Sequence, residues 1–139
     1  MASLCIMLLL IPVTSYASSY TNLHYFSGVV LPETSGNTTL SSTSSKTTSY
    51  SYGKAKITSY ANCSTVSVWL RTKTSDGSYH YWTPYILDID DVNSYHTVKY
   101  SDSSSSYYAK GVYADLRAEN YDQALNIWTD KVSGCVYFN

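Results

Sequence analysis

The stretch CSTVSVWLRTK, residues 63–73, alternates apolar and polar side chains with a period of two. Successive side chains of a β-strand point to opposite faces, so this pattern predicts a strand with one aliphatic side and one polar side. The side expected to face a core carries Val66, Val68 and Leu70, and the opposite side carries Ser67, Trp69 and Arg71. The stretch therefore favours a sheet with one buried face.

A second stretch, KGVYADLRAE at residues 110–119, alternates in the same way. Its Ala, Leu, Arg and Glu residues are good helix formers, which makes a helix the alternative. The strict period of two favours a strand instead. We expect Val112, Ala114, Leu116 and Ala118 to face inward, with Tyr113, Asp115, Arg117 and Glu119 outward.

The rest of the chain has the composition of a β protein, with 16 Tyr against 2 Phe and abundant Ser and Thr. Tyr, Thr and Val suit the pleated surface of a sheet. Residues 33–49 are nearly devoid of apolar side chains and read either as a Ser/Thr-rich linker or as an irregular edge strand. Further strands are expected at residues 22–31, 50–60, 94–100, 125–129 and 132–138. The sequence predicts an all-β fold, a single-domain antiparallel β-sandwich or flattened barrel of about seven or eight strands over residues 18–139.

The first seventeen residues resemble a secretory signal peptide. The uncharged apolar run LCIMLLLIPV, residues 4–13, is followed by Ser15-Tyr16-Ala17, a small-x-small cleavage pattern, although no Lys or Arg precedes the run. A run this short does not span a bilayer as a helix, which takes about twenty residues. We expect residues 1–17 to be cleaved rather than to form an anchor or a buried helix, leaving a secreted chain without a stable membrane span.

Removal of the leader would leave two cysteines, Cys63 and Cys135. An even number in an exported chain favours a disulfide, which would close a loop of about 70 residues and stabilise the fold by roughly 4 kcal/mol. Two buried thiols are the alternative. A redox pair is disfavoured because no Cys-x-x-Cys is present.

The segment SYHYWTPYILDID, residues 78–90, follows Asp76-Gly77, a dipeptide typical of a tight hairpin turn. Pro84 cannot donate a ladder hydrogen bond, so this returning strand should lie at a sheet edge or bend there. Alternation would place Tyr79, Tyr81, Thr83 and Tyr85 on one side, with His80, Trp82 and Ile86 on the other. Trp82 is then expected to face the core.

Tyr79, Tyr81 and Tyr85 are the best binding candidates. Side chains two apart on one strand face lie about 6.6 Å apart, so three rings would form a flat platform for sugars or anchors for a protein partner. The alternative is that these rings simply cover the outer face of a polar sheet.

The turn DIDDVN, residues 88–93, offers the hard oxygen ligands Asp88, Asp90 and Asn93 to calcium. It departs from an EF-hand loop, with Val92 at a ligand position and Asn93 in place of Gly. A solvated Asp-rich turn is the favoured interpretation, and no cofactor is expected. Sequons at Asn37 and Asn62 would matter only in a eukaryotic secretory path.

No catalytic constellation stands out. The chain has no Gly-x-Ser-x-Gly elbow, and nothing places a second acid opposite the acidic turn for glycoside cleavage. The three histidines are scattered, and only His80 and His96 would be candidates to share a metal with Asp88 or Asp90. We expect a protein that is not an enzyme.

The charges are few and uneven. The net charge is −1, which gives no indication of nucleic-acid binding or of an anionic membrane surface. Up to Ser75 there are five Lys or Arg and one acid, and from Asp76 onward there are four against nine. This asymmetry either steers a partner or marks two solvated faces of one domain.

The order CSTVSVWLRT, VYADLRAEN and VSG before a closing VYF resembles small exported proteins of Gram-positive bacteria that form an uncharacterised family. The similarity spans about the last ninety residues and implies a secreted β-sandwich, without catalytic or binding residues to transfer. The leader and the Tyr-rich composition are also similar to lactococcin-like bacteriocins, although the closing CVYFN does not clearly match their tyrosine motif.

Together these observations predict a secreted or wall-associated binding module. Its Tyr-rich face would take a cell-surface glycan or a protein partner. A bacteriocin-like antibacterial protein is the alternative function.

Overall fold

The computed structural model describes residues 22–32, 36–101, 103–121 and 129–139, and within them the chain forms strands and short 3-10 turns. The elements before the acidic turn are β1 (Leu23–Val30), β2 (Thr38–Thr43), β3 (Tyr52–Ala61), β4 (Thr65–Lys73), β5 (Tyr79–Tyr81) and β6 (Tyr85–Asp88). Those that follow are η1 (Ile89–Asp91), β7 (His96–Lys99), η2 (Ser105–Tyr108), β8 (Tyr113–Asn120) and β9 (Lys131–Tyr137).

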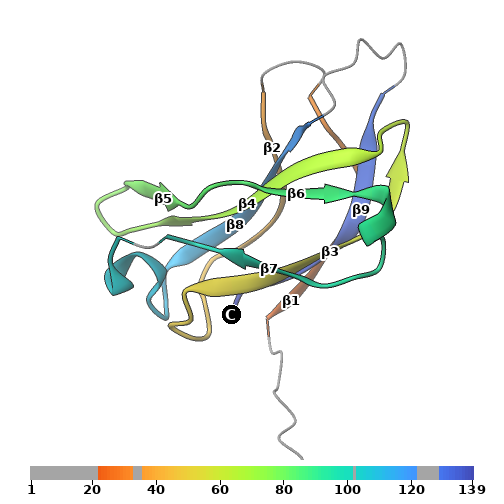
Figure 1. The fold of residues 1–139 in the computed structure, drawn as a ribbon. Helices are drawn as coiled ribbons and strands as arrows, with labels where there is room; N and C mark the ends of the chain where they lie inside the picture. Colours follow the sequence, from red (N-terminus) through yellow and green to blue (C-terminus); the bar gives the residue numbers. More distant parts are fainter. Residues whose placement is uncertain (1–21, 33–35, 102, 122–128) are drawn as a thin grey trace, which may run out of the picture.

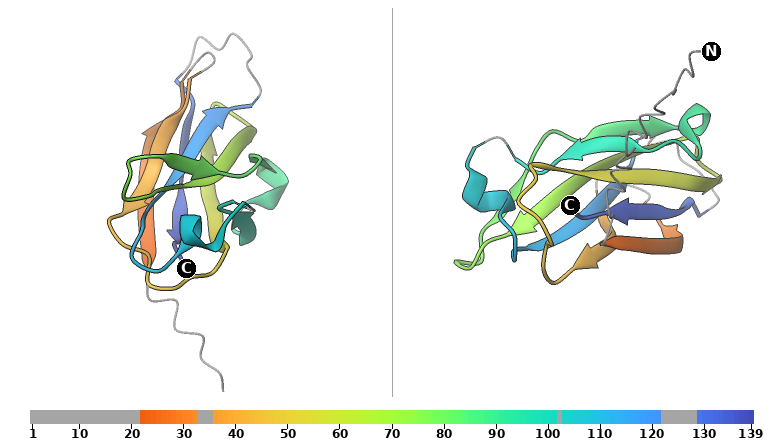
Figure 2. Two further views of the ribbon diagram at one scale, coloured as in Figure 1. Left: turned by 90° about the vertical axis from the view of Figure 1, so that its left-hand side faces the viewer. Right: turned by 90° about the horizontal axis from the view of Figure 1, so that it is seen from below.

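The strands form two antiparallel sheets packed face to face (Figures 1 and 2). Sheet A has the order β1-β9-β3-β7, and sheet B has the order β2-β8-β4-β5, with β6 also paired to β4. The predicted all-β sandwich is confirmed, and the sheets do not close into a barrel. The described residues hold nine strands rather than seven or eight, because the Tyr-rich edge of sheet B is divided into β5 and β6.

The core lies between the sheets and is built from the two alternating stretches. Val66, Val68 and Leu70 of β4 are fully buried, as are the alanines and the leucine of β8. These strands pair directly, with Leu70 opposite Leu116, so their aliphatic sides form one continuous surface. The predicted inward residues are confirmed except for Val112, which is half-buried and precedes β8, and the helix alternative for residues 110–119 is wrong.

Part of the Ser/Thr-rich segment is an irregular edge strand. Strand β2 pairs with β8 at the edge of sheet B, and its register shifts between Thr39 and Ser41. Leu40 and Thr43 are buried, so this polar segment still contributes to the core. The linker interpretation is therefore wrong for residues 38–43.

The hairpin between β4 and β5 turns at Asp76-Gly77, as predicted. Gly77 has φ of 88°, which is favourable only for glycine, but Asp76 is not among the residues with positive φ. The Gly77 amide donates to Thr74, and the Asp76 carboxylate accepts from the Ser78 amide at 3.0 Å. A side-chain acceptor thus stabilises the turn together with the positive φ of Gly77.

Some expectations lie outside the described residues. These are the leader at residues 1–17 and most of the strand expected at 125–129. Among the described residues, no helix has the length and hydropathy needed to cross a membrane.

Candidate functional site

Trp69 lies where the edge strand of sheet B is interrupted. Strand β5 pairs with residues 71–73 of β4, and β6 pairs with residues 65–68. Neither strand pairs with Trp69 or Leu70 on that side of β4, because the chain leaves the ladder between Tyr81 and Tyr85, where Pro84 lacks an amide hydrogen. Leu70 points into the core, so Trp69 is the side chain of the outer face at this interruption.

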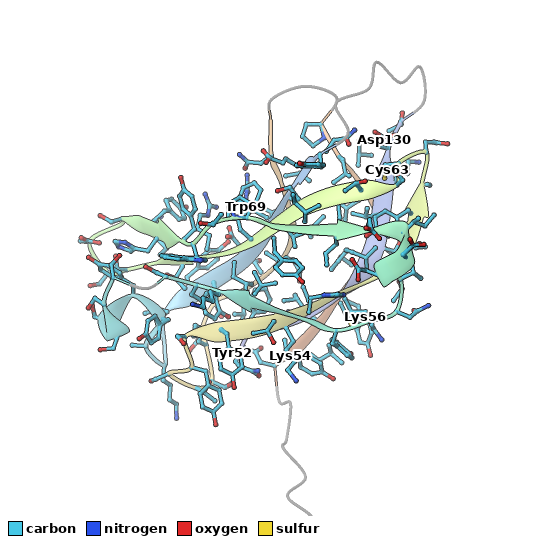
Figure 3. All side chains as sticks on the ribbon, in the orientation of Figure 1. Tyr52, Lys54, Lys56, Cys63, Trp69 and Asp130 are labelled. Atoms are coloured by element: carbon cyan, nitrogen blue, oxygen red, sulfur yellow. The ribbon has the colours of Figure 1, made fainter. Side chains whose placement is uncertain are left out.

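A pocket of about 400 Å³ forms around this indole (Figure 3 labels Trp69). Its lining residues are Asn37, Trp69, Arg71, Tyr81, Pro84 and Glu119. Trp69 is only 8% exposed, whereas Tyr81 is 60% exposed. The pocket therefore has a largely covered indole at its base and an accessible phenol beside it.

An ion pair between half-buried Arg71 and the buried Asp115 orients one wall of the pocket. The Arg71 guanidinium donates through Nη2 to Asp115 at 2.6 Å and through Nε at 3.1 Å. The Tyr113 hydroxyl donates to the same carboxylate at 3.2 Å, and Asp115 is fully buried. The hydrogen bonds to Asp115 raise the pKa of Arg71, and the guanidinium carbon lies 3.9 Å from the centre of the Tyr79 ring. Arg71 is thus held in one orientation.

Arg117 holds the other wall in place. It lies opposite Trp69 on β8, and its Nε donates to the side-chain oxygen of Asn37 at 3.0 Å. Its Nη2 donates to the Asn37 backbone carbonyl at 3.2 Å. A residue just before β2 is thereby fixed against the pocket, although it is more than thirty positions from Trp69 in the sequence.

The pocket combines aromatic faces with fixed donors and acceptors. Trp69 and Tyr81 offer apolar faces, Glu119 offers a carboxylate, and Arg71 and Asn37 offer polar groups. The volume of the pocket falls within the range of about 300–1,000 Å³ that is common for small-ligand sites. The arrangement suits a ligand with one flat apolar face and several hydroxyl groups, such as a sugar ring.

The three predicted tyrosines are exposed, but they do not share a face. Tyr79 and Tyr81 lie opposite Lys73 and Arg71, on the outer face of sheet B. Tyr85 lies opposite Val68, whose side chain faces the core. Tyr81 pairs with Arg71 and Tyr85 pairs with Val68, so a step of four residues on the edge strand matches a step of three on β4. The register therefore shifts by one residue, and Tyr85 points to the opposite face of sheet B from Tyr81. The predicted row of three rings is therefore wrong as geometry, while a binding role for Tyr79, Tyr81 and Tyr85 remains a prediction.

The prediction that Trp82 is turned into the core is wrong, because this indole is 39% exposed. Trp82 and Tyr85 line a second pocket of about 300 Å³ with Pro84, Val98 and Lys99. The Lys99 amine lies 5.5 Å from the Trp82 ring. Pro84 thus separates two pockets, one on the outer face of sheet B and one toward β7.

The acidic turn uses its carboxylates to cap η1. Asp88 accepts from the Asp90 amide at 2.8 Å, and Asp91 accepts from the Asp88 amide at 3.4 Å. Asn93 has φ of 67° and donates its amide to Ile57. In the described part of the chain no three His, Cys, Asp or Glu residues gather as a metal site. The structure adds no support for calcium at Asp88, Asp90 and Asn93.

The two histidines considered for a shared metal have separate surroundings. His80 stacks on Tyr107 with 3.5 Å between ring centres. His96 lies 3.5 Å from Asp91 and packs against Tyr85. Their positions on β5 and β7 put them in different sheets.

The structure does not form the predicted Cys63–Cys135 disulfide. The Cys63 sulfur contacts the carbonyl of Lys131, which is four residues, or about 13 Å of strand, from Cys135. Cys135 is buried, and its sulfur lies 3.5 Å from the Tyr95 hydroxyl. Cys63 follows β3 and Cys135 lies in β9, the strand paired with β3, but the register of this pair keeps the two cysteines apart.

Sequence reasoning overlooked Trp69, Arg71, Asn37 and Glu119 as site residues. One signal was present, since Trp69 is a large aromatic residue on the predicted polar side of its strand. Such a residue must be covered by other side chains or contact a ligand.

Comparison with protein-family models, with curated proteins and with solved structures found no match for this chain.

Proposed function

We propose that this chain is a secreted, non-catalytic binding protein that takes a neutral glycan in the Trp69 pocket. The observation that carries the proposal is the interruption of the edge strand at Trp69, which opens an aromatic pocket on an otherwise continuous sheet. One sugar ring would lie against Trp69 and Tyr81. Its hydroxyl groups would bond to Glu119 and Arg71, both of which line the pocket.

Preorganisation supports this assignment. Arg71 is fixed by Asp115, and Asn37 is fixed by Arg117, so a ligand would not have to order these walls. Binding loses less free energy when the groups that contact the ligand are already held in place. Secretion and the bacteriocin-like alternative rest on the leader and on sequence resemblance alone, and they remain predictions.

The test is a glycan array with wild type, Tyr81→Ala and Glu119→Gln. Tyr81 is mostly exposed, so its truncation should leave the unfolding midpoint nearly unchanged. Loss of an aromatic contact should weaken glycan binding by about 1 to 3 kcal/mol. Glu119→Gln keeps the size of the side chain and should weaken the same ligands, because the amide is a poorer acceptor than the carboxylate.

Tyr25→Ala is the matched control. Tyr25 is 77% exposed on β1 in sheet A, away from the pocket, so binding of neutral glycans should be retained. A wild-type protein that retains no neutral glycan would contradict the proposal. Equal binding by wild type and Tyr81→Ala would contradict it as well.

A further inference from the structure

The outer face of sheet A carries positive charge and tyrosine rings. Strands β1, β3, β7 and β9 contain four lysines and neither Asp nor Glu. The core side of β3 is Gly53, Ala55 and Ile57, which are buried, so its lysines point outward. We define the lysine–tyrosine face by the residues Tyr25, Tyr52, Lys54, Lys56, Tyr95, Lys99 and Tyr137.

Strand register brings these residues together. Lys54 lies opposite Tyr137, Lys56 lies opposite Cys135, and Tyr52 lies opposite Lys99. Cys135 in turn lies opposite Tyr25 on the next strand. Figure 3 labels Tyr52, Lys54 and Lys56, which follow one another along β3.

The lysines are close neighbours. Lys54 and Lys56 are two residues apart on one strand face, or about 6.6 Å. Lys99 is the diagonal cross-strand neighbour of Lys54, a position at which Cα atoms lie about 7–8 Å apart. These positions concentrate positive charge on one part of sheet A, which complements an anionic ligand.

The rings form a connected surface beside the amines. Tyr95 and Tyr137 have ring centres 5.5 Å apart, and the Lys56 amine lies 4.6 Å from the Tyr95 ring. Among the large hydrophobic side chains that the structure describes, Tyr25 has the highest exposed fraction. Tyr95 also contacts Cys135 through its hydroxyl, which anchors this ring to β9.

We propose that the lysine–tyrosine face binds an acidic polysaccharide. The amines would pair with carboxylates along the polymer, while the tyrosine rings would lie against its sugar rings. Charge complementarity selects an anionic partner, and the exposed rings favour a polymer of sugars over a simple anionic surface. This surface belongs to the other sheet from the Trp69 pocket and does not depend on the function proposed there.

The probe is polygalacturonate, a polymer of uronic acids, with neutral pullulan as its counterpart. Wild type should bind polygalacturonate and not pullulan, and the affinity should fall as sodium chloride is raised. The double variant Lys54→Glu/Lys56→Glu should lose at least tenfold in affinity, because each lysine near an anionic surface contributes about fivefold. Tyr25→Ala should also weaken binding.

Lys73→Glu/Lys110→Glu is the matched control, since it makes the same change of charge at two exposed lysines outside the lysine–tyrosine face. It should bind polygalacturonate within about twofold of wild type. Lys54→Gln/Lys56→Gln removes the charge but keeps long polar side chains, which guards against loss of binding through misfolding. Thermal unfolding of each variant checks this directly.

Equal binding of wild type to pullulan and polygalacturonate would overturn the proposal, as would unchanged affinity in both double variants of Lys54 and Lys56. Tighter binding to single-stranded DNA or to phosphatidylglycerol vesicles than to polygalacturonate would also overturn it. The double variants of Lys54 and Lys56 should still bind neutral glycans at the Trp69 pocket, so failure at one surface is distinguishable from failure at the other.

Discussion

Lys46 makes the stability of this protein depend on pH in the alkaline range. The residue is 1% exposed, and its amine donates to the backbone carbonyl of Tyr50 at 2.9 Å and to the backbone oxygen of Asn139. The amine also lies 3.5 Å from the centre of the buried Tyr100 ring. Burial lowers the pKa of Lys46 from 10.5 to about 7. The folded protein therefore favours the neutral amine.

The sign follows from the difference in bound protons. Above about pH 7 the folded state releases the Lys46 proton, whereas the unfolded state keeps it up to about pH 10.5. The free energy of unfolding should rise with pH across this window, by up to about 1.4 kcal/mol per pH unit. Between about pH 7 and pH 9 the expected gain is about 2 kcal/mol, since the folded-state amine is still half protonated at the lower limit.

The assay is urea unfolding at pH 7, 8 and 9 of wild type, Lys46→Met and the exposed-lysine control Lys110→Met. The slope should be lost in Lys46→Met and kept in Lys110→Met. Burial also raises the pKa of Tyr60 and Tyr100, and the stability from these tyrosines is lost only as pH rises above about 10, outside the window. A wild-type stability that is flat or falling over this range, or an equal slope in Lys46→Met, would refute the reasoning.

Three further predictions follow from the fold. Gly134→Ala should lower the free energy of unfolding by about 1 to 3 kcal/mol in urea titration, because the new Cβ would overlap the Lys56 carbonyl of the adjacent strand; wild-type stability would contradict this. Trp82→Ala should cost only about 1 kcal/mol in the same assay, well below the roughly 3 to 5 kcal/mol of a buried indole. A thiol reagent should label half-exposed Cys63 in the native protein and buried Cys135 only after unfolding. If no thiol reacted after unfolding without reductant, this prediction would be wrong and the cysteines would be disulfide-bonded.

Local alternation was sufficient to predict the two central strands of sheet B. The pattern in residues 63–73 and 110–119 assigns each side chain to a face without reference to a partner, because alternation is a property of the extended backbone. The predicted inward residues of β4 and β8 proved to be core. Strand β2 was harder to predict, since only Leu40 gives its Ser/Thr-rich segment an apolar signal.

Alternation failed where the chain leaves the ladder. Residues 78–88 read as one continuous strand, but the break around Pro84 adds a residue and inverts every face beyond it. Pro84 correctly predicted a bend. The number of extra residues in that bend depends on pairing with β4, which no local pattern specifies. Tyr85 was therefore assigned to the wrong side, and Trp82 was expected to be buried although it is exposed at this open edge.

The sequence by itself determined the fold class and the residues that form the core, because both depend on side-chain type and on a short-range period of two. Only the tertiary structure decided which distant residues meet. Asn37 and Glu119 reach Trp69 through the pairing of β8 with its neighbours, and Lys54, Lys99 and Tyr137 meet through the register of three strands. Register also kept Cys63 and Cys135 apart. Strand order and register arise from long-range packing of the whole chain, so the two candidate binding surfaces exist only once the sheets have assembled.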